Sequence, residues 1–327
     1  MTAEASATEQ TAEPAGARKA PRQALRQVLK QAPPRHARRP NWAVAVLRTA
    51  RPRQWPKNLL VFAAPLAGAT WGRPHGALYA LVAAVAFGCA SVAVYFINDV
   101  VDAERDRQHP RKRFRPVAAG DLPKSHAVVI GVLCAAVGLS AGLIVSVPLL
   151  TAAVGTYLGI SFLYSFVIKN IPVVELIFVA SGFLLRVLGG AAATHVPPSV
   201  WFLVVCSLGA LGVAVAKRYT ELAGLGPAAI QHRPVLRYYR PGALLAAQWL
   251  IGAGLIAAYL AWAAGERTDA QPWHLISAIP LAAALIRFGM LTKRHTSAPV
   301  EDLLTRNGLM LTCELTWLAL FVTGLQA

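Results

Sequence analysis

Charged residues are scarce in this chain, and negatively charged ones are the scarcest. Only 14% of the 327 residues are charged, with 15 Asp and Glu against 32 Lys and Arg, while 56% are hydrophobic. About a quarter of the residues of a typical soluble domain are charged, so this composition excludes an ordinary soluble globular fold. It predicts a polytopic membrane protein.

Cysteine is also rare, and the usual nucleophilic constellations are missing. The chain has no CxxC pair and no histidine close to a cysteine, so we expect its four cysteines to pack within apolar segments. No Ser-His-Asp or Cys-His arrangement can be identified, which leaves covalent catalysis without a candidate. The four cysteines are Cys89, Cys134, Cys206 and Cys313.

Apolar runs of membrane-spanning length recur from Leu59 onward. About 20 such residues cross a hydrocarbon core roughly 30 Å thick. The sequence therefore predicts an all-α polytopic fold with nine spans, the first of them short and open to being tilted or interrupted. The expected spans are 58–72, 76–98, 125–145, 148–167, 172–194, 199–215, 242–264, 273–291 and 305–325.

The segment before these spans is basic and has no apolar signal-peptide core. We expect residues 1–50 to form a disordered cytoplasmic arm and residues 51–327 to form one membrane domain with no second soluble core. The arm could touch anionic lipid, although a solvated tail that only sets topology is the better explanation of its charge.

Positive charge lies mostly on one side of the predicted membrane. If the arm and the connections after even-numbered spans share a side, that side holds 28 of the 32 Lys and Arg, whereas Arg73 and Arg267 lie opposite. Cationic loops stay in the cytoplasm, so the N-terminus is predicted to be cytoplasmic. Because the basic residues are divided among membrane loops, we expect no nucleic-acid partner.

A carboxylate cluster ends the second predicted span. On one continuous helix, Asn98, Asp99, Asp102 and Asp106 fall within an arc of about 100°, whereas Glu104 points elsewhere. Hard oxygen ligands suit Mg²⁺, which commonly bridges a few carboxylates to substrate phosphates. The four residues on the shared face are therefore candidate metal ligands at the cytoplasmic ends of the helices.

Basic and polar side chains near this cluster are candidate ligands for several phosphate groups, since Arg offers a planar fork and Lys a point charge. A positive-inside anchor is the alternative for the loop cations, membrane-interface snorkelling for Lys169, and packing against a helix end for Arg186. The candidates are Lys57, Arg105, Arg111, Lys112, Arg115, Tyr164, Lys169, Glu175, Arg186, Lys217, Arg218, Glu221, Arg233 and Arg237.

The last two predicted spans each carry a charged residue well inside the apolar run. Arg287 and Glu314 have similar expected depths, six to ten residues from the cytoplasmic helix ends. We predict that they form a structural ion pair between these helices.

The motif Asn98-Asp99-x-x-Asp102-x-x-x-Asp106, followed by an Arg-Pro-containing loop, resembles the UbiA superfamily of intramembrane prenyltransferases over nearly all of residues 51–327. That resemblance implies nine transmembrane helices around a central cavity open to the cytoplasm, with diphosphate bound through Mg²⁺ at two acidic motifs. Where relatives carry the second acidic motif, this chain has the basic segment Lys217-Arg218-Tyr219-Thr220-Glu221.

This departure, together with Arg53-Gln54-Trp55-Pro56-Lys57-Asn58 and His109-Pro110-Arg111-Lys112-Arg113, is similar to the branch of that superfamily that uses phosphoribosyl diphosphate. The resemblance implies Mg²⁺-dependent transfer of 5-phosphoribose to polyprenyl phosphate in a bacterial plasma membrane, for cell-wall arabinan synthesis. The implied catalytic residues are Asp99, Asp102 and Lys169.

The expected partners are phosphoribosyl diphosphate, polyprenyl phosphate and the lipid bilayer, with a homo-oligomer left open. Two other functions remain compatible with the sequence. One is prenyl transfer from a prenyl diphosphate to an aromatic acceptor, and the other is lipid transport without catalysis, because a helical bundle proves no chemistry.

Overall fold

The computed structural model describes residues 41–68, 75–108, 112–226, 229–230, 233–265, 269–294 and 300–326. Residues from Trp42 onward form one compact unit, and the described residues contain helices and no strands. The short helix α2, Trp42–Ala50, belongs to this unit. Most of the arm expected at residues 1–50 lies outside the described residues.

Among the described residues, seven helices are long and apolar enough to cross a membrane, and an eighth, α15, is apolar but shorter. These helices confirm the all-helical polytopic fold, while the count of nine spans remains a prediction. These helices are α4 (Gly76–Val101), α7 (Lys124–Ile144), α8 (Pro148–Phe166), α9 (Val174–Ala193), α10 (Val200–Leu225), α12 (Pro241–Gly265), α13 (Gln271–Arg294) and α15 (Gly308–Gly324).

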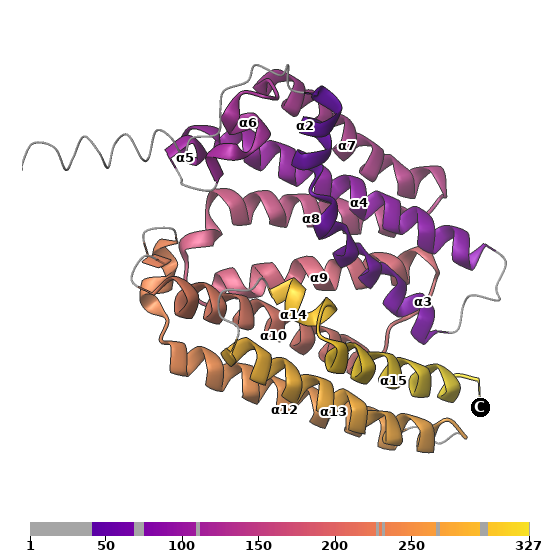
Figure 1. Cartoon of the computed structure of the whole chain (residues 1–327). Coiled ribbons are helices and arrows are strands. Elements are labelled where there is room, and N and C mark those ends of the chain that lie inside the picture. Colours follow the sequence, from indigo (N-terminus) through magenta and orange to yellow (C-terminus); the bar gives the residue numbers. More distant parts are fainter. Residues whose placement is uncertain are drawn as a thin grey trace, which may run out of the picture. The chain divides into compact units, whose positions relative to one another are not determined.

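The long helices pack mainly against their neighbours in sequence. Helix α4 packs on α7, α8 on α9, α10 on α12, and α13 on α15 (Figure 1). Because the connections reverse the chain each time, one end of the bundle collects the C-terminus of α4, the N-terminus of α7 and the α8–α9 junction. We call this end the motif end, since it carries the segment Asn98–Asp106.

Short helices cover the motif end and connect the long ones. Proline or glycine begins or ends several of them, as expected for tight connections. They are α5 (Ala103–Gln108), η3 (Lys112–Phe114), α6 (Pro116–Ala119), η4 (Ile168–Asn170), η5 (Pro234–Tyr238) and α14 (Val300–Thr305).

The first expected span is not a single α-helix. The described part of the span 58–72 includes the end of the 3₁₀ helix η1, Pro52–Phe62, and the short α-helix α3, Ala63–Ala67, whereas residues 69–72 lie outside the described residues. Pro56 lies inside η1 and removes a backbone donor, which prevents regular α-helical hydrogen bonding there. The 3₁₀ segment packs against α4 and α9.

The sixth expected span is longer than predicted. Helix α10 continues to Leu225, so the segment from Lys217 to Glu221 is helical and does not belong to a loop. The apolar run ends near residue 215, but the polar residues after it continue the helix because Lys, Arg and Glu favour helices. Hydropathy therefore placed the end of the span too early.

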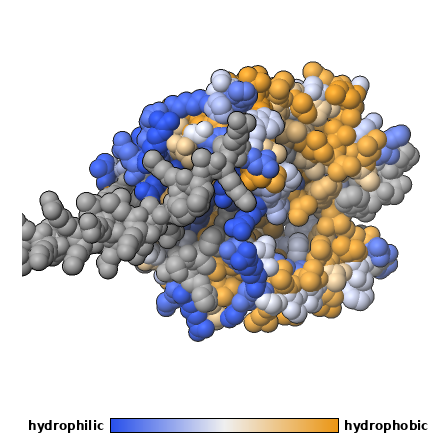
Figure 2. Space-filling model, turned by 45° about the horizontal axis from the view of Figure 1, so that its top comes forward, coloured by the Kyte–Doolittle hydropathy of each residue, from blue (hydrophilic) through white to orange (hydrophobic). Residues whose placement is uncertain are grey.

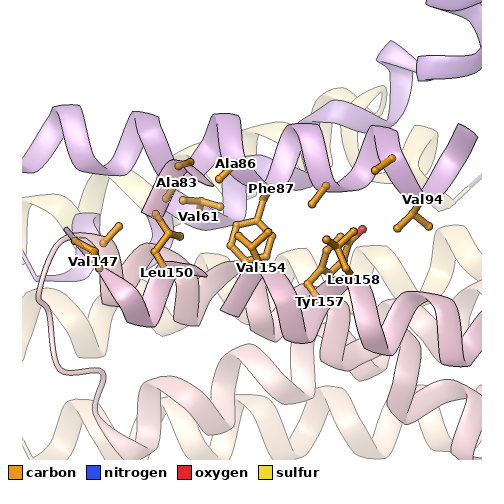
Figure 3. Close-up of a cluster of buried hydrophobic side chains, with 14 residues drawn as sticks. Val61, Ala83, Ala86, Phe87, Val94, Val147, Leu150, Val154, Tyr157 and Leu158 are labelled. Carbon is orange, nitrogen blue, oxygen red and sulfur yellow. The ribbon is translucent and has the colours of Figure 1, made fainter. Parts of the chain in front are cut away.

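A cluster of buried hydrophobic side chains lies between α4 and α8. Phe87 on α4 and Tyr157 on α8 approach edge to face, with ring centroids 5.6 Å apart. Figure 3 shows the surrounding side chains of the two helices pointing toward one another, with Val61 of η1 beside them. This packing fixes α4, whose C-terminal end carries the acidic motif.

Close backbone contact joins η1 to α9 at a glycine. A Cβ atom on Gly190 would lie 1.8 Å from the carbonyl oxygen of Val61, so only glycine fits. This contact explains how an irregular segment can pack tightly within the bundle.

The outer surface of the bundle is apolar along the spans. On the face shown in Figure 2, hydrophobic residues cover much of the right half of the bundle, whereas hydrophilic residues gather at the left, where α5 and α6 lie in Figure 1, and continue into the middle. On helix α7, for example, the residues Val129, Val132 and Leu133 are each more than half exposed. Such a surface suits contact with lipid.

The predicted ion pair between Arg287 and Glu314 was wrong. Within the described residues, the Arg287 Nε donates to Asn307 Oδ1 at 3.4 Å, and no ion pair joins it to Glu314. Asn307 caps the N-terminus of α15 by accepting a hydrogen bond from Met310 N. Asn307, at the start of α15, therefore lies closer to the Arg287 guanidinium than Glu314, which is further along the same helix.

Candidate functional site

Two buried carboxylates converge at the motif end. Asp99 lies in the last turn of α4 and Asp106 lies in α5, and both are nearly inaccessible to solvent. The Arg115 Nη1 atom lies 3.2 Å from Asp99 Oδ1 and 2.7 Å from Asp106 Oδ2. We call Asp99 and Asp106 the acidic pair.

A second arginine also contacts this pair. Arg51, between α2 and η1, donates through Nη2 to Asp99 Oδ1, and its guanidinium lies 5.0 Å from the ring centroid of Tyr95. Its backbone is left-handed, with φ 52° and ψ 62°, which turns the chain from α2 into η1. Sequence reasoning missed Arg51, because an arginine before the first span looks like a topology anchor.

The other members of the predicted metal cluster do not join the acidic pair. Helix α4 ends at Val101 and Asp102 lies in the turn before α5, so the single continuous helix assumed from sequence is interrupted. In the described part of the chain, no three Asp, Glu, His or Cys side chains converge as metal ligands. Asn98 and Asp102 are half-buried nearby, and their metal-binding roles remain predictions.

The acidic pair alone fits a divalent cation. One nitrogen of Arg115 already contacts an oxygen from each carboxylate, so a positive charge at this place is stabilised from two sides. Mg²⁺ commonly uses one or two carboxylates and completes its coordination with water and substrate phosphate. The donor set present is therefore sufficient for such a site.

Glu104 has a different environment from the acidic pair. It is exposed and forms ion pairs with Arg107 at 2.7 Å and Lys124 at 2.8 Å. These cations, with Lys124 first, lower the pKa of its carboxyl. This agrees with the expectation that Glu104 points away from the metal-binding face.

A second group of charged side chains lies where α8, α9 and α10 meet at the motif end. Arg218 binds Glu175 through two hydrogen bonds of 2.6 and 2.5 Å, and both side chains are almost completely buried. Arg218 also contacts Glu221 at 2.9 Å. We call Glu175 and Arg218 the buried ion pair. These contacts give Arg218 a structural role.

Arg233 and Tyr164 extend this group toward solvent. Arg233 Nη1 donates to the Tyr164 hydroxyl at 2.9 Å, and its Nε lies 3.3 Å from Glu221. Arg218 donates to the same hydroxyl at 3.2 Å. Arg233 is about one-third exposed, so it can contact a ligand as well as these partners.

A strained turn leads into the buried ion pair. Val173 has φ 65° and ψ −50°, and Val174 N donates to Pro172 O at 2.7 Å, which defines a γ-turn of the rare positive-φ type. Val173 N donates to the Tyr239 hydroxyl at 2.8 Å, and this hydroxyl lies 3.4 Å from Glu175 Oε1. Tyr239 thus ties the strained turn to the ion pair.

Lys112, in η3, is affected by charges of both groups. Burial lowers the pKa of its amine most, the charges of Arg115 and Arg233 lower it further, and those of Asp106 and Asp102 raise it. The predicted phosphate ligand Lys112 therefore lies within electrostatic range of both the acidic pair and Arg233.

The remaining candidates are more scattered. Lys57 lies 6.0 Å from the ring centroid of Phe183, and Lys169 is half-buried in η4. Arg237 donates to its neighbour Tyr238 at 2.5 Å and is exposed. Arg105 is exposed and Lys217 is half-buried, whereas Arg111 lies outside the described residues.

Arg186 lies in the membrane-spanning part of α9, and its hydrogen-bond partners among the described residues are all neutral groups. It donates to Asn58 Oδ1 at 2.8 Å, Ser91 Oγ at 2.9 Å and Tyr157 Oη at 3.0 Å, and to the Gly182 carbonyl. Its guanidinium also stacks over Tyr157 at 4.6 Å. These contacts join α9 to η1, α4 and α8, which gives Arg186 a structural role.

An apolar cavity of about 380 Å³ adjoins this polar cluster. It is bordered by η1, α4 and α7, and Asn58 is its main polar residue. Leu59 and Val85 on its rim are more than half exposed on the lipid-facing surface. The cavity can accept a hydrocarbon chain from the side of the bundle.

Comparison with known proteins identifies relatives over most of the chain. The profile of the UbiA prenyltransferase family matches residues 59–309. The decaprenyl-phosphate phosphoribosyltransferase of Mycobacterium tuberculosis is 34% identical over 283 residues, which cover 85% of this chain and 93% of that protein. The enzyme of the same name from Corynebacterium glutamicum is 34% identical over 255 residues, or 76% of each chain.

Solved structures share the fold at lower sequence identity. A UbiA homologue from Archaeoglobus fulgidus bound to GPP and Mg²⁺ has a TM-score of 0.66 at 15% identity, covering 86% of this chain and 98% of that one. A UbiA homologue from Aeropyrum pernix has a TM-score of 0.55 at 17% identity, with 81% and 98% covered.

Proposed function

Because the chain belongs to the UbiA prenyltransferase family, we propose that it transfers 5-phosphoribose from phosphoribosyl diphosphate to a polyprenyl phosphate and releases diphosphate. The observation that carries this proposal is the extent of the similarity to decaprenyl-phosphate phosphoribosyltransferases. It covers 85% of this chain and 93% of the mycobacterial relative, so the whole catalytic domain is matched.

The acidic pair suits the diphosphate end of the donor. Asp99 and Asp106, with Asn98 and Asp102 beside them, would hold Mg²⁺, which when bound neutralises charge that develops on the leaving diphosphate. A cation there would compete with Arg115 for the same oxygens. Arg115 released from the carboxylates would then be available to contact phosphate.

The 5-phosphate of the donor needs a separate cationic contact. Lys112 in η3 and Arg233 before η5 both lie at the motif end, and neither side chain is fully buried. Lys169 in η4 is half-buried at the same end of the bundle. We assign the 5-phosphate to these three side chains.

The acceptor places few demands on the protein. Its phosphate oxygen is already an anion, so the reaction needs no strong general base. This agrees with the absence of a nucleophile-base constellation in the sequence. The cavity beside Asn58 and Leu59 would hold part of the isoprenoid chain, with the phosphate delivered at the motif end.

We place the motif end in the cytoplasm of a bacterial cell, where the soluble donor is available, with the spans in the plasma membrane. The concentration of Lys and Arg in the connections at this end supports the orientation. The lipid product would serve as a precursor for cell-wall arabinan.

Purified protein in proteoliposomes with radiolabelled phosphoribosyl diphosphate and polyprenyl phosphate tests the proposal. We expect labelled lipid and free diphosphate in equal amounts. A parallel reaction with prenyl diphosphate and an aromatic acceptor tests the first alternative. Prenylated product there, without labelled lipid in the first reaction, would refute phosphoribosyl transfer, and inactivity in both would favour a transporter.

A further inference from the structure

Helix α2 is apolar on two opposite faces. Ala45, Thr49 and Ala50 are buried on one face, whereas Val44 and Leu47 on the other are 48% and 53% exposed. The only charged residue within the helix is Arg48. A helix in water would present polar side chains on its outer face, so the outer face of α2 is not adapted to water.

The buried face of α2 packs on the motif end of the spans. Ala45 and Ala50 belong to a cluster with Phe96 of α4, Ala103 of α5 and Val117 of α6. The helix therefore lies at the depth at which α4 ends and α7 begins. Nine residues of helix extend about 14 Å, too short to cross a bilayer.

The surface next to α2 has the composition of a membrane interface. A cavity of about 370 Å³ opens between Trp42 and the first turns of α7, and it is lined by Ser125, His126, Val129 and Ile130. The exposed apolar surface of α7 continues from Val129 to Val132 and Leu133. Trp with mixed polar and apolar neighbours is typical of the headgroup level.

We propose that α2 is an in-plane membrane helix whose outer face, Val44 and Leu47, inserts into the interfacial region of the bilayer, and whose first residue, Trp42, is exposed beside the first turns of α7. The occupant of this face is lipid, because the face continues the lipid-facing surface of α7 and lies at the level of the span ends. Short apolar helices of this kind bury one face at the boundary of headgroups and acyl chains.

This arrangement has a consequence for the acidic pair. Arg51, which contacts Asp99, directly follows the last residue of α2. Insertion of α2 would fix the backbone from which Arg51 reaches the carboxylate. The membrane surface would thereby contribute to the geometry of the site without contacting a substrate.

Spin labels on single cysteines test the proposal in nanodiscs. The background carries alanine in place of the four native cysteines, and the test sites are Val44→Cys and Leu47→Cys. The controls are Glu104→Cys, exposed at the motif end, and Val132→Cys, exposed within a span. Collision with oxygen, which favours the bilayer, and with a water-soluble nickel complex is measured at each site.

For both test sites we expect an oxygen-to-nickel ratio several-fold above that of Glu104→Cys and below that of Val132→Cys. A ratio equal to that of Glu104→Cys would overturn the proposal, because the face would then contact water. Protection from both reagents would also overturn it, since protein, either a partner or a second copy, would then cover the face. The readout does not depend on catalysis, so it stands apart from the proposed reaction.

Discussion

Arg218 and Glu175 carry opposite charges and are both almost completely buried. Each side chain therefore depends on the other to compensate its charge. Removal of Glu175 leaves Glu221 as the remaining carboxylate partner of the buried Arg218 guanidinium, and breaking a buried ion pair typically costs about 3–5 kcal/mol. We expect Glu175→Gln to lower the free energy of unfolding by about 3 kcal/mol, measured by denaturation in detergent. The exposed Glu104→Gln should cost less than about 1 kcal/mol.

The double variant Glu175→Gln/Arg218→Met separates the pair from its surroundings. The double variant should be more stable than Glu175→Gln alone, because it no longer buries the Arg218 guanidinium beside a neutral Gln side chain. Equal stability of Glu175→Gln and Glu104→Gln would contradict a structural role for the buried ion pair.

Tyr239 supports the strained turn at Val173 through a single hydroxyl. Tyr239→Phe removes the acceptor for Val173 N and the donor to Glu175, and we expect a loss of about 1–2 kcal/mol in stability. Tyr238→Phe is the matched control, because its exposed hydroxyl contacts only Arg237. Melting temperatures in detergent compare the variants.

The same residue gives a pH dependence. Burial raises the pKa of Tyr239 above its ordinary value of 10.0, so the folded state favours the protonated phenol. Its stabilising contribution is complete below pH 10.0 and is lost as the pH rises through the folded pKa. The melting difference between the native protein and Tyr239→Phe should therefore shrink above that pH. A constant difference up to pH 11 would contradict the assignment.

At this scale the sequence predicted some of the candidate site and missed other parts. The shared face of Asp99 and Asp106 followed from helical periodicity, and the structure brings both to one nitrogen of Arg115. Pairing between distant elements, such as Arg218 with Glu175, depends on tertiary packing that no local pattern contains. Arg51 was missed for the same reason.

Among the elements, η1 and α9 are joined by a close backbone contact between Val61 and Gly190. Gly190→Ala would place a Cβ atom 1.8 Å from Val61 O, so the helices must separate. We expect a loss of about 1–3 kcal/mol, as for other overpacked sites. Gly159→Ala in α8 is the control, since nothing lies within 4 Å of its added Cβ.

The control should be neutral or more stable than the native protein, because alanine favours helix over glycine by about 1 kcal/mol. Thermal unfolding in detergent compares the two variants directly. If both changed stability by the same amount, the tight contact between η1 and α9 would not matter.

Hydropathy located the helices better than their ends. The expected run 76–98 corresponds to α4, and the run 242–264 corresponds to α12. The first run, which was left open to interruption, changes from the 3₁₀ helix η1 to the α-helix α3 after Phe62, and the sixth was too short because its last turns are polar. Length and apolarity thus predict membrane crossing, whereas helix ends depend on proline and capping.

For the whole molecule, the distribution of Lys and Arg predicts the orientation in the membrane. Glu104→Cys at the motif end and Asp269→Cys at the opposite end, both exposed, report the two sides. In intact cells, an impermeant maleimide should label Asp269→Cys at once and Glu104→Cys only after permeabilisation. The reverse pattern would contradict the cytoplasmic placement of the site.

We expect the acidic pair to bind the divalent cation that phosphoribosyl transfer needs. One comparison of variants tests this most directly. Transfer of radiolabelled phosphoribose to polyprenyl phosphate is measured across a Mg²⁺ titration for the native protein, Asp99→Asn and the control Glu104→Gln. We expect Asp99→Asn to lose at least about 100-fold in rate and to need more Mg²⁺, with Glu104→Gln close to native. Equal rates and equal Mg²⁺ dependence for all three proteins would contradict the account.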